Sequence, residues 1–451
     1  MIRYNLVTRV DACKARLRRT QIAEISGTVT KMLGLVVEVE GLTGLAAIGD
    51  RLALRTLRGR IVPAEVIGFR DAALQAMAYG SLDGLAHGAK ALLLGGSDAM
   101  LDVASGWLGR VIDPLGNPLD QAGILLGGSH PRSTRVAPPE ATSRARLGPR
   151  IDLGVRALNC FATCRQGQRL GLFAGSGVGK STLLAMLTRG TACDVVVLAL
   201  VGERGREVRD FIETELGPEG LAHAVVVVAT SDSPPLMRRQ CAYTAMSVAE
   251  HFRDQGLSVL LLMDSVTRFC LALREIGLSL GEPPATRGYP PSVFAELPRL
   301  LERAGPGPVR PDGTAGQITG LFSVLVEGDD QNEPVADAVR GILDGHIVMD
   351  RKIAEAGRYP AIDVLRSLSR VAASCLDDAQ TAALRRARAI LSLHGEMADM
   401  VRLGAYRPGT DSAVDEALRL TPAIEEFLQQ APGERSEFVE SFERLNQALA
   451  G

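Results

Sequence analysis

The feature that most constrains the fold is a series of short apolar runs between residues 168 and 326. None of the runs alternates apolar with polar residues, and polar segments of helix length separate them; they are RLGLFA, DVVVLALV, HAVVVVAT, SVLLLMD and GLFSVLV. Strands that are buried on both faces have this composition, and helical crossovers between such strands imply a parallel sheet. The sequence therefore predicts an α/β core.

Different patterns flank this core on both sides. In GLVVEVEGL, Leu35, Val37 and Val39 are expected on one face of a strand, with Glu38 and Glu40 on the opposite face. Glycine-containing turns separate similar segments between about residues 22 and 92, which favours a small β-barrel. After about residue 376 the apolar runs stop and helical spacing takes over. The predicted organisation is a basic N-terminal segment (1–21), a β-barrel domain (22–92), an α/β domain (93–375) and a helical domain (376–451).

Composition limits the functional classes. The 451 residues include 50 basic and 52 acidic side chains, and a net charge of -2 argues against a broad surface for nucleic acid. The apolar runs are far shorter than the roughly 18 residues that a membrane span needs. Seven scattered cysteines and the lack of a signal-peptide pattern favour a reducing, cytoplasmic compartment.

The strongest chemical signal is AGSGVGKST, residues 174–182, between a predicted strand and a helix-like segment. A glycine-rich loop in this context points backbone N–H groups at phosphate oxygens, at a helix end that favours negative charge. Lys180 is expected to reach the β- and γ-phosphates of ATP, and the Ser181 hydroxyl to ligate Mg²⁺. The predicted nucleotide-binding residues are Gly175, Ser176, Gly177, Val178, Gly179, Lys180, Ser181 and Thr182.

Two carboxylates are predicted at the same edge of the sheet. Asp264 ends the run SVLLLMD, where it could hold Mg²⁺, although an aspartate there could also cap the next helix. Glu203 follows DVVVLALV in VGERGREV and could polarise the attacking water, with Arg204 beside it to offset phosphate charge. Spacing alone equally allows Glu203 and Arg204 to be a surface ion pair.

Several longer stretches carry a family resemblance over nearly the whole chain. They are AGSGVGKST, GERGREV, LLLMDSVTRF, RGYPPSVFAELPRLLERAG, EGDDQNEPVADAVRGILDGHIV and YPAIDVLRSLSR. Their order resembles that of the catalytic subunits of rotary ATPases and of the related ATPases of type III protein export. GERGREV and GYPPSVFAELPRLLERAG look more like the export branch. Within that branch, GVRALNCFATCRQGQRLGLFAGSGVGKST and VRGILDGHIVMDRKIAEAGRYPAID resemble flagellar ATPases most, with injectisome ATPases as the close alternative. This resemblance implies a RecA-like P-loop ATPase domain.

The resemblance also implies roles for single residues. Glu203 matches the catalytic glutamate, and Arg268 matches an arginine that reaches the γ-phosphate from the same subunit, although it could be a solvated helix residue. Tyr359 matches the aromatic residue that stacks on adenine, or it could only anchor a turn. Arg370 matches the arginine finger that a subunit inserts into its neighbour's site. Taken alone, residues 358–370 (RYPAIDVLRSLSR) are expected to form a turn followed by a helix.

The function implied is a Mg-dependent ATPase that forms a homohexameric ring and drives or primes the export of flagellar proteins. Its expected place is the cytoplasm, peripheral to the inner membrane at the export apparatus. The expected partners are a cytoplasmic regulator, stalk proteins, the export gate, and exported substrates with their chaperones.

Two other classes of protein fit the sequence less well. A non-catalytic ring subunit should lack Glu203 or Lys180, and both are present. A ring-shaped nucleic-acid motor should carry basic or aromatic stretches in its barrel, but residues 22–92 contain only Phe69 and Tyr79 as aromatic side chains. No nucleic-acid partner is therefore expected.

The first twenty residues contain six basic side chains and one acidic side chain. With apolar residues between them, they could form an amphipathic helix that docks on an anionic membrane surface or on a partner protein. A solvated tail is the alternative.

Overall fold

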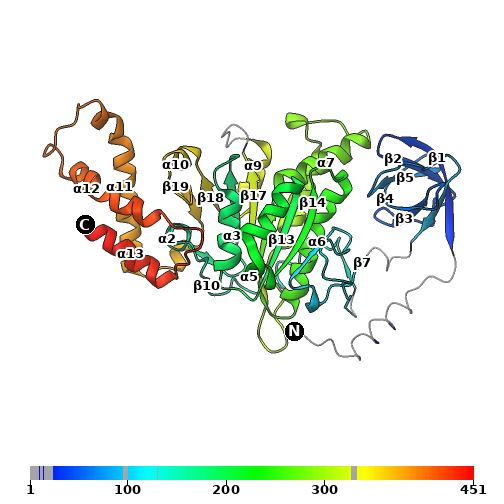
Figure 1. Ribbon diagram of the computed structural model, residues 1–451, viewed down its shortest axis with the longest axis horizontal. Helices are drawn as coiled ribbons and strands as arrows, with labels where there is room; N and C mark the ends of the chain where they lie inside the picture. The colour runs from blue at the N-terminus through cyan, green and yellow to red at the C-terminus, as the bar shows by residue number, and fades with distance from the viewer. Residues whose placement is uncertain (1–9, 11–13, 15–23, 95–99, 129–130, 327–332) are drawn as a thin grey trace.

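The computed structural model describes residues 24–94, 100–128, 131–326 and 333–451, together with Val10 and Lys14. The predicted N-terminal segment, residues 1–21, lies outside the described residues apart from these two. Figure 1 shows a β-barrel at one end of the molecule, an α/β core in the middle and a group of helices at the other end. In the described parts of the chain, no helix is both long enough and apolar enough to cross a membrane.

The predicted barrel is confirmed as a closed barrel with strand order β1-β2-β5-β4-β3-β6, in which neighbouring strands run antiparallel. Val37 and Val39 are fully buried inside it, whereas Glu38 and Glu40 lie on the other side of β2. Leu35, expected on the buried face, instead lies in the turn before β2 and is 40% exposed. The strands are β1 (Ile25–Leu33), β2 (Val36–Glu40), β3 (Arg51–Arg55), β4 (Ile61–Arg70), β5 (Ala73–Ala78) and β6 (Lys90–Leu93).

The predicted α/β core is a mainly parallel sheet with the order β19-β18-β12-β17-β15-β13-β14-β8, to which β16 adds beside β17. Only β19 and β16 run antiparallel to their neighbours. All five apolar runs form strands of this sheet. Its strands are β8 (Arg110–Ile112), β12 (Arg169–Ala174), β13 (Val195–Glu203), β14 (Ala224–Thr230), β15 (Ser258–Asp264), β16 (Gly305–Pro306), β17 (Gln317–Leu325), β18 (Gly345–Met349) and β19 (Ile362–Ser369).

Helices cover both faces of the sheet, which explains why its strands are apolar on both sides. One face packs against α2, α3, α4 and the C-terminal helices, and the other packs against α6, α7, α8 and α9. The helices of the core are α2 (Arg156–Phe161), α3 (Lys180–Gly190), α4 (Gly205–Asp210), the π-helical turn η2 (Phe211–Leu216), α5 (Gly217–Ala222), α6 (Pro235–Asp254), α7 (Val266–Ser279), α8 (Pro291–Leu301), α9 (Pro334–Ile342) and α10 (Arg351–Glu355).

Short elements complete the connections around the core. Two small antiparallel sheets pair β7 with β9 and β10 with β11. The elements are β7 (Met100–Leu101), β9 (Arg132–Ser133), β10 (Arg150–Ile151), β11 (Cys164–Arg165) and the 3₁₀ turns η1 (Ser105–Trp107), η3 (Thr286–Gly288) and η5 (Ala372–Ser374).

The prediction of a helix within residues 358–370 is wrong. Residues Ile362–Ser369 form β19, which pairs antiparallel with β18 at the edge of the sheet. Residues 110–112 form the opposite edge strand β8. In both segments the backbone pairs with another strand of the sheet, and this tertiary pairing decides the conformation where the local pattern is weak.

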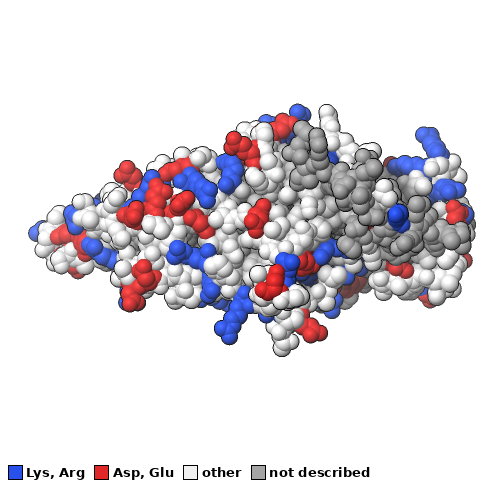
Figure 2. Space-filling model, turned by 90° about the horizontal axis from the view of Figure 1, so that it is seen from below, with Lys and Arg blue, Asp and Glu red and all other residues white. Residues whose placement is uncertain are grey.

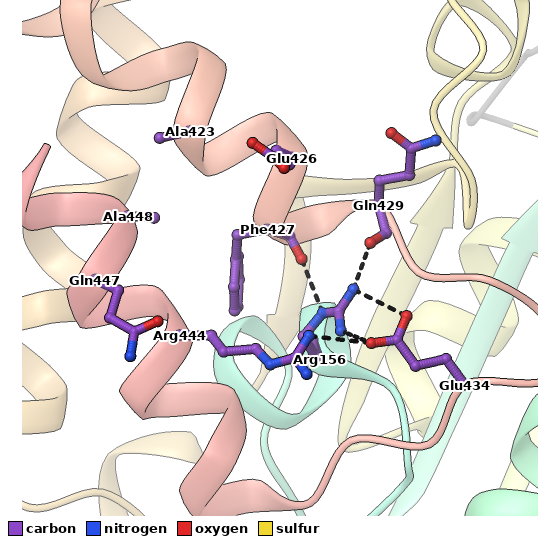
Figure 3. Close-up of a pocket in the computed structure, with 9 residues that line it drawn as sticks. All are labelled: Arg156, Ala423, Glu426, Phe427, Gln429, Glu434, Arg444, Gln447 and Ala448. Atoms are coloured by element: carbon purple, nitrogen blue, oxygen red, sulfur yellow. Dashed lines mark hydrogen bonds and ion pairs between the residues drawn. The ribbon is translucent and has the colours of Figure 1, made fainter.

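The predicted helical C-terminal region is confirmed as α11 (Asp378–Arg402), α12 (Ser412–Leu428) and α13 (Phe438–Ala450). Arg156 at the start of α2 joins this region to the core (Figure 3). Its Nε donates to the carbonyl oxygen of Phe427 at 3.0 Å, and its guanidinium also bonds the carbonyl of Gln429 and the carboxylate of Glu434. Because the last carbonyls of a helix lack intrahelical partners, this buried cation satisfies the end of α12.

A buried charge cluster joins the barrel to the core. Glu65 of β4 accepts hydrogen bonds from Arg239 of α6 at 2.6 Å and from the Tyr79 hydroxyl at 2.5 Å, and Arg135 lies 2.7 Å from its other oxygen. Burial alone would raise the pKa of Glu65, but Arg239 and Arg135 outweigh it and hold that pKa below its ordinary value. The barrel is thus fixed to the core by a charged contact in which Glu65 and Arg239 are buried and Arg135 is partly exposed.

Changing Glu65 to leucine is expected to lower the free energy of unfolding by about 3 to 5 kcal/mol, because the buried Arg239 loses its partner. Chemical denaturation followed by circular dichroism measures this loss. The double variant Glu65→Leu/Arg239→Met should lose less than the single variant, because it leaves no unpaired buried charge; the remaining cation, Arg135, is 38% exposed and can be solvated. A double variant that is less stable than Glu65→Leu would contradict this account.

Candidate active site

The phosphate-binding loop lies where the sequence predicts it, between β12 and α3. Gly177 and Gly179 have φ values of +79° and +85°, a left-handed conformation that residues with a Cβ rarely adopt. This conformation lets successive N–H groups converge at the N-terminus of α3, where the helix dipole favours an anion. The loop, residues 175–179, and the first turn of α3 therefore form an anion site at the carboxyl edge of the sheet.

Lys180, Glu203 and Asp264 converge at this edge. β13 and β15 are parallel neighbours whose register places Leu200 beside Asp264. The Nζ atom of Lys180 lies 2.5 Å from Oδ1 of Asp264 and 3.8 Å from Oε1 of Glu203. Ser181 lines the same small recess as the two carboxylates. The structure thus brings together four side chains that the sequence predicts for phosphate and metal binding and for catalysis.

Glu203 has an unusual electrostatic environment. Its pKa is raised above that of an ordinary glutamate, first by burial and then by repulsion from Asp264, and these effects outweigh attraction by Lys180 and Arg268. A carboxylate with a raised pKa is a stronger base when it is deprotonated. Such a group is suited to accept a proton from water at this site.

Arg268 lies beside Glu203 because the chain has a glycine at position 202. A Cβ there would come within 3.1 Å of the Arg268 Cβ, and Gly202 also has a left-handed φ of +72°. Ser265 is the N-cap residue of α7, and its hydroxyl oxygen accepts a hydrogen bond from the backbone N–H of Arg268 at 3.3 Å. Among the described residues, the buried Nε of Arg268 has no hydrogen-bond acceptor, so it is available to an anion.

Tyr359 lies against the phosphate-binding loop although it is far away in the sequence. A Cβ at Gly179 would be 3.3 Å from two atoms of its ring. The residue is 43% exposed, so part of the ring remains open beside the loop. An aromatic side chain in this position can stack on a flat ring.

The single chain does not bring Arg204 or Arg370 to the other predicted site residues. The Arg204 side chain is 80% exposed and forms an ion pair with Glu207 at 3.0 Å. Arg370 is exposed just beyond Ser369, and Ser369 pairs with Gly345 at the end of β18 that is remote from the phosphate-binding loop. The roles predicted for both arginines remain predictions.

Sequence reasoning missed two side chains that contact this site. Ser323 of β17 donates from its Oγ to Oδ1 of Asp264 at 2.6 Å. The signal for it was a lone hydroxyl in the apolar run GLFSVLV. Arg351, at the start of α10, donates to the carbonyl oxygen of Ser176 at 3.4 Å, and no local pattern in the sequence marks this contact.

Comparisons with known proteins place the chain in a family. Residues 154–369 match the nucleotide-binding domain of the ATP synthase alpha/beta family, and residues 376–447 match the C-terminal domain of the type III secretion ATPase EscN. A flagellum-specific ATP synthase of Caulobacter vibrioides is 52% identical over 96% of this chain and 98% of its own length.

The chain is a type III export ATPase of the ATP synthase alpha/beta family. A type 3 secretion system ATPase of Xanthomonas euvesicatoria is 45% identical over 95% of this chain and 93% of the relative. The assembled EscN of enteropathogenic E. coli superposes with a TM-score of 0.85 at 38% identity, over 94% of this chain and 100% of EscN. The predicted ATP-hydrolysing P-loop enzyme and its three-part fold are confirmed.

Proposed function

We propose that this export ATPase hydrolyses Mg-ATP at the carboxyl edge of the sheet and serves the export of flagellar proteins. The observation that carries the proposal is the convergence of Lys180, Glu203 and Asp264 beside the phosphate-binding loop. The loop N–H groups and Lys180 bind the β- and γ-phosphates. For this, Lys180 exchanges its contact with Asp264 for the phosphate oxygens.

The side chains at this edge also fit a magnesium ion. Mg²⁺ prefers oxygen ligands and is commonly held by one or two carboxylates together with substrate phosphates. Ser181 and Asp264 supply a hydroxyl and a carboxylate in one recess and would hold the ion between them. Bound there, Mg²⁺ would neutralise charge on the phosphates.

Glu203 is proposed as the base that takes the proton of the attacking water. Its position at the end of β13 and its raised pKa both support this role. Arg268, whose buried Nε has no acceptor in the described part of the chain, stabilises the negative charge that develops on the γ-phosphate oxygens. Tyr359 stacks on the adenine ring in the same subunit.

We further propose that the chain works as a homohexameric ring in which Arg370 completes a neighbour's site. Arg370 follows the edge strand β19, on which Leu365 and Leu368 are 42% and 50% exposed. An edge strand with exposed apolar side chains is suited to be covered by another chain. The related EscN is described as assembled, and also in complex with its central stalk EscO. Arg204, exposed near the same edge of the sheet, would offset phosphate charge.

The flagellar assignment is supported by similarity to the flagellum-specific ATP synthases of Caulobacter vibrioides and Bacillus subtilis, the second 45% identical. In this setting the protein acts in the cytoplasm, peripheral to the inner membrane. A stalk protein, a regulator, the export gate, and substrates with their chaperones are its partners. Residues 1–21 would dock on the regulator or on anionic lipid.

A nucleic-acid motor is not favoured by the surface of the molecule. On the face seen in Figure 2, acidic and basic side chains are interspersed over the C-terminal helices and the core. Proteins that track nucleic acid gather basic side chains along a groove. The overall charge of -2 points the same way.

The flagellar assignment is tested by replacing Lys180 with alanine in the organism's own gene. Loss of the lysine should abolish ATP hydrolysis and reduce secretion of the filament protein to background, because the phosphates lose their main cationic contact. Immunoblots of the culture medium measure secretion, with the unaltered gene restored as the control. Normal filament secretion combined with loss of a needle-type secreted protein would assign the enzyme to an injectisome.

A further inference from the structure

We propose that Ser323 is a positioning residue that holds the carboxylate of Asp264 in the orientation needed for metal binding. The Ser323 hydroxyl donates to Oδ1 of Asp264 at 2.6 Å. Both residues are deeply buried, with exposed fractions of 1% for Ser323 and 4% for Asp264. This inference rests on the proposed role of Asp264 in binding Mg²⁺.

The location of Ser323 in the sheet explains how it reaches Asp264. β17 lies between β12, which leads into the phosphate-binding loop, and β15, which ends in Asp264. In the register of these strands, Ser323 lies beside Leu172 of β12, while Phe322 lies beside Met263 of β15. Ser323 is therefore the next residue along β17 and is level with Asp264.

A hydroxyl in this place needs a polar partner. Leu172 beside it and Leu321 two residues before it both belong to the hydrophobic cluster on one face of the sheet. A buried hydroxyl that is left without a hydrogen bond destabilises the folded protein. The hydrogen bond to Asp264 satisfies this hydroxyl and links the two strands at the edge that carries the site.

Asp264 accepts hydrogen bonds from two donors. One of them is expected to leave when ATP binds, and the other is expected to stay. Lys180 and Ser323 both contact Oδ1. Lys180 has a long, flexible side chain that turns to the phosphates. Ser323 is short and lies on a central strand, and the end of that strand is anchored where Leu325 N–H donates to the Thr267 hydroxyl at 2.9 Å. Ser323 therefore keeps Oδ1 in place after Lys180 leaves, while Oδ2, which accepts no hydrogen bond from any described residue, can contact the metal.

The test is the magnesium dependence of nucleotide binding by the full-length protein. Binding of a fluorescent, non-hydrolysable ATP analogue is titrated at increasing Mg²⁺ for the wild type and for Ser323→Ala. Loss of a group that orients a metal ligand typically reduces metal affinity about 10- to 100-fold, so the half-saturating Mg²⁺ concentration should rise about tenfold or more. Affinity for the analogue without Mg²⁺ should not change, because the loop and Tyr359 are intact.

Three further variants separate a positioning role from a general loss of stability. Ser323→Thr keeps the hydroxyl and should have the same Mg²⁺ requirement as the wild type. Ser441→Ala removes another buried serine hydroxyl, in α13 and away from the site, and should leave the requirement unchanged. Asp264→Asn should raise the requirement at least as much as Ser323→Ala, because it alters the ligand itself.

Two outcomes would overturn different claims. If Asp264→Asn raises the Mg²⁺ requirement and Ser323→Ala does not, the positioning role of Ser323 is wrong while the proposed metal site stands. If neither variant changes the requirement, the metal role proposed for Asp264 is wrong, and the role of Ser323 is wrong with it.

Discussion

Replacing Glu203 with glutamine is expected to lower kcat by about 10²- to 10⁴-fold while ATP binding is retained, because the base that accepts the proton of water is lost. Glutamine has nearly the same size as glutamate and can still hydrogen-bond a water molecule, but it cannot accept that proton. Phosphate release under saturating Mg-ATP measures kcat, and binding of a fluorescent ATP analogue measures affinity.

The matched control for this substitution is Glu213→Gln in the π-helical turn η2. The Glu213 side chain is 59% exposed and pairs with Arg209, so losing its charge should leave turnover unchanged. Turnover of Glu203→Gln within a factor of two of the wild-type value would show that Glu203 is not the base.

The pH dependence of the wild-type enzyme provides a second readout of Glu203. A base acts only when it is deprotonated, so kcat/KM should fall as the pH falls through the pKa of Glu203 in the free enzyme. Because burial and Asp264 raise this pKa, the acid limb should have its midpoint above the roughly 4.3 of a free glutamate. An acid limb at or below that value would contradict the environment described for Glu203.

Replacing Arg370 with alanine is expected to lower turnover by about 10³- to 10⁵-fold without weakening ATP binding, because an arginine finger acts on charge that develops in the transition state. Within its own chain, Arg370 lies at the end of β19 that is remote from the phosphate-binding loop. Its effect should therefore be exerted on the nucleotide of a neighbouring subunit. Wild-type activity should also rise steeply with protein concentration as rings form.

Mixing two inactive variants tests this sharing of the site. Arg370→Ala chains keep the phosphate-binding lysine, and Lys180→Ala chains keep the arginine finger. In mixed rings, some interfaces pair an intact Lys180 with an intact Arg370, so activity should partly return at concentrations where rings assemble. Steady-state phosphate release is measured across a titration of the two variants. If mixed rings form and no mixture exceeds either variant alone, Arg370 acts within its own chain or only supports the structure.

Much of the fold of this protein can be predicted from patterns within short segments of the sequence. The apolar runs predict the five strands they form, because a strand covered by helices on both faces excludes polar side chains throughout. The sequence of residues 174–182 predicts the conformation of the phosphate-binding loop, because glycines can adopt the left-handed backbone that Gly177 and Gly179 have in the structure. Alternation of apolar and polar residues predicts the strands of the barrel, and helical spacing of apolar residues after residue 376 predicts the C-terminal helices, because each pattern places apolar side chains on one buried face.

Other features depend on contacts between remote segments and were decided only by the tertiary structure. Residues 362–369 are a strand because β18 offers a hydrogen-bonding partner, and this pairing carries Tyr359 to the loop and Arg370 away from it. The raised pKa of Glu203 requires burial and a neighbouring Asp264, 61 positions away in the sequence. The bond from Ser323 to Asp264 requires the register of two parallel strands. A strong local pattern sets the conformation of its own segment, whereas the conformation of weakly patterned segments and the electrostatics of the site depend on which segments are packed side by side.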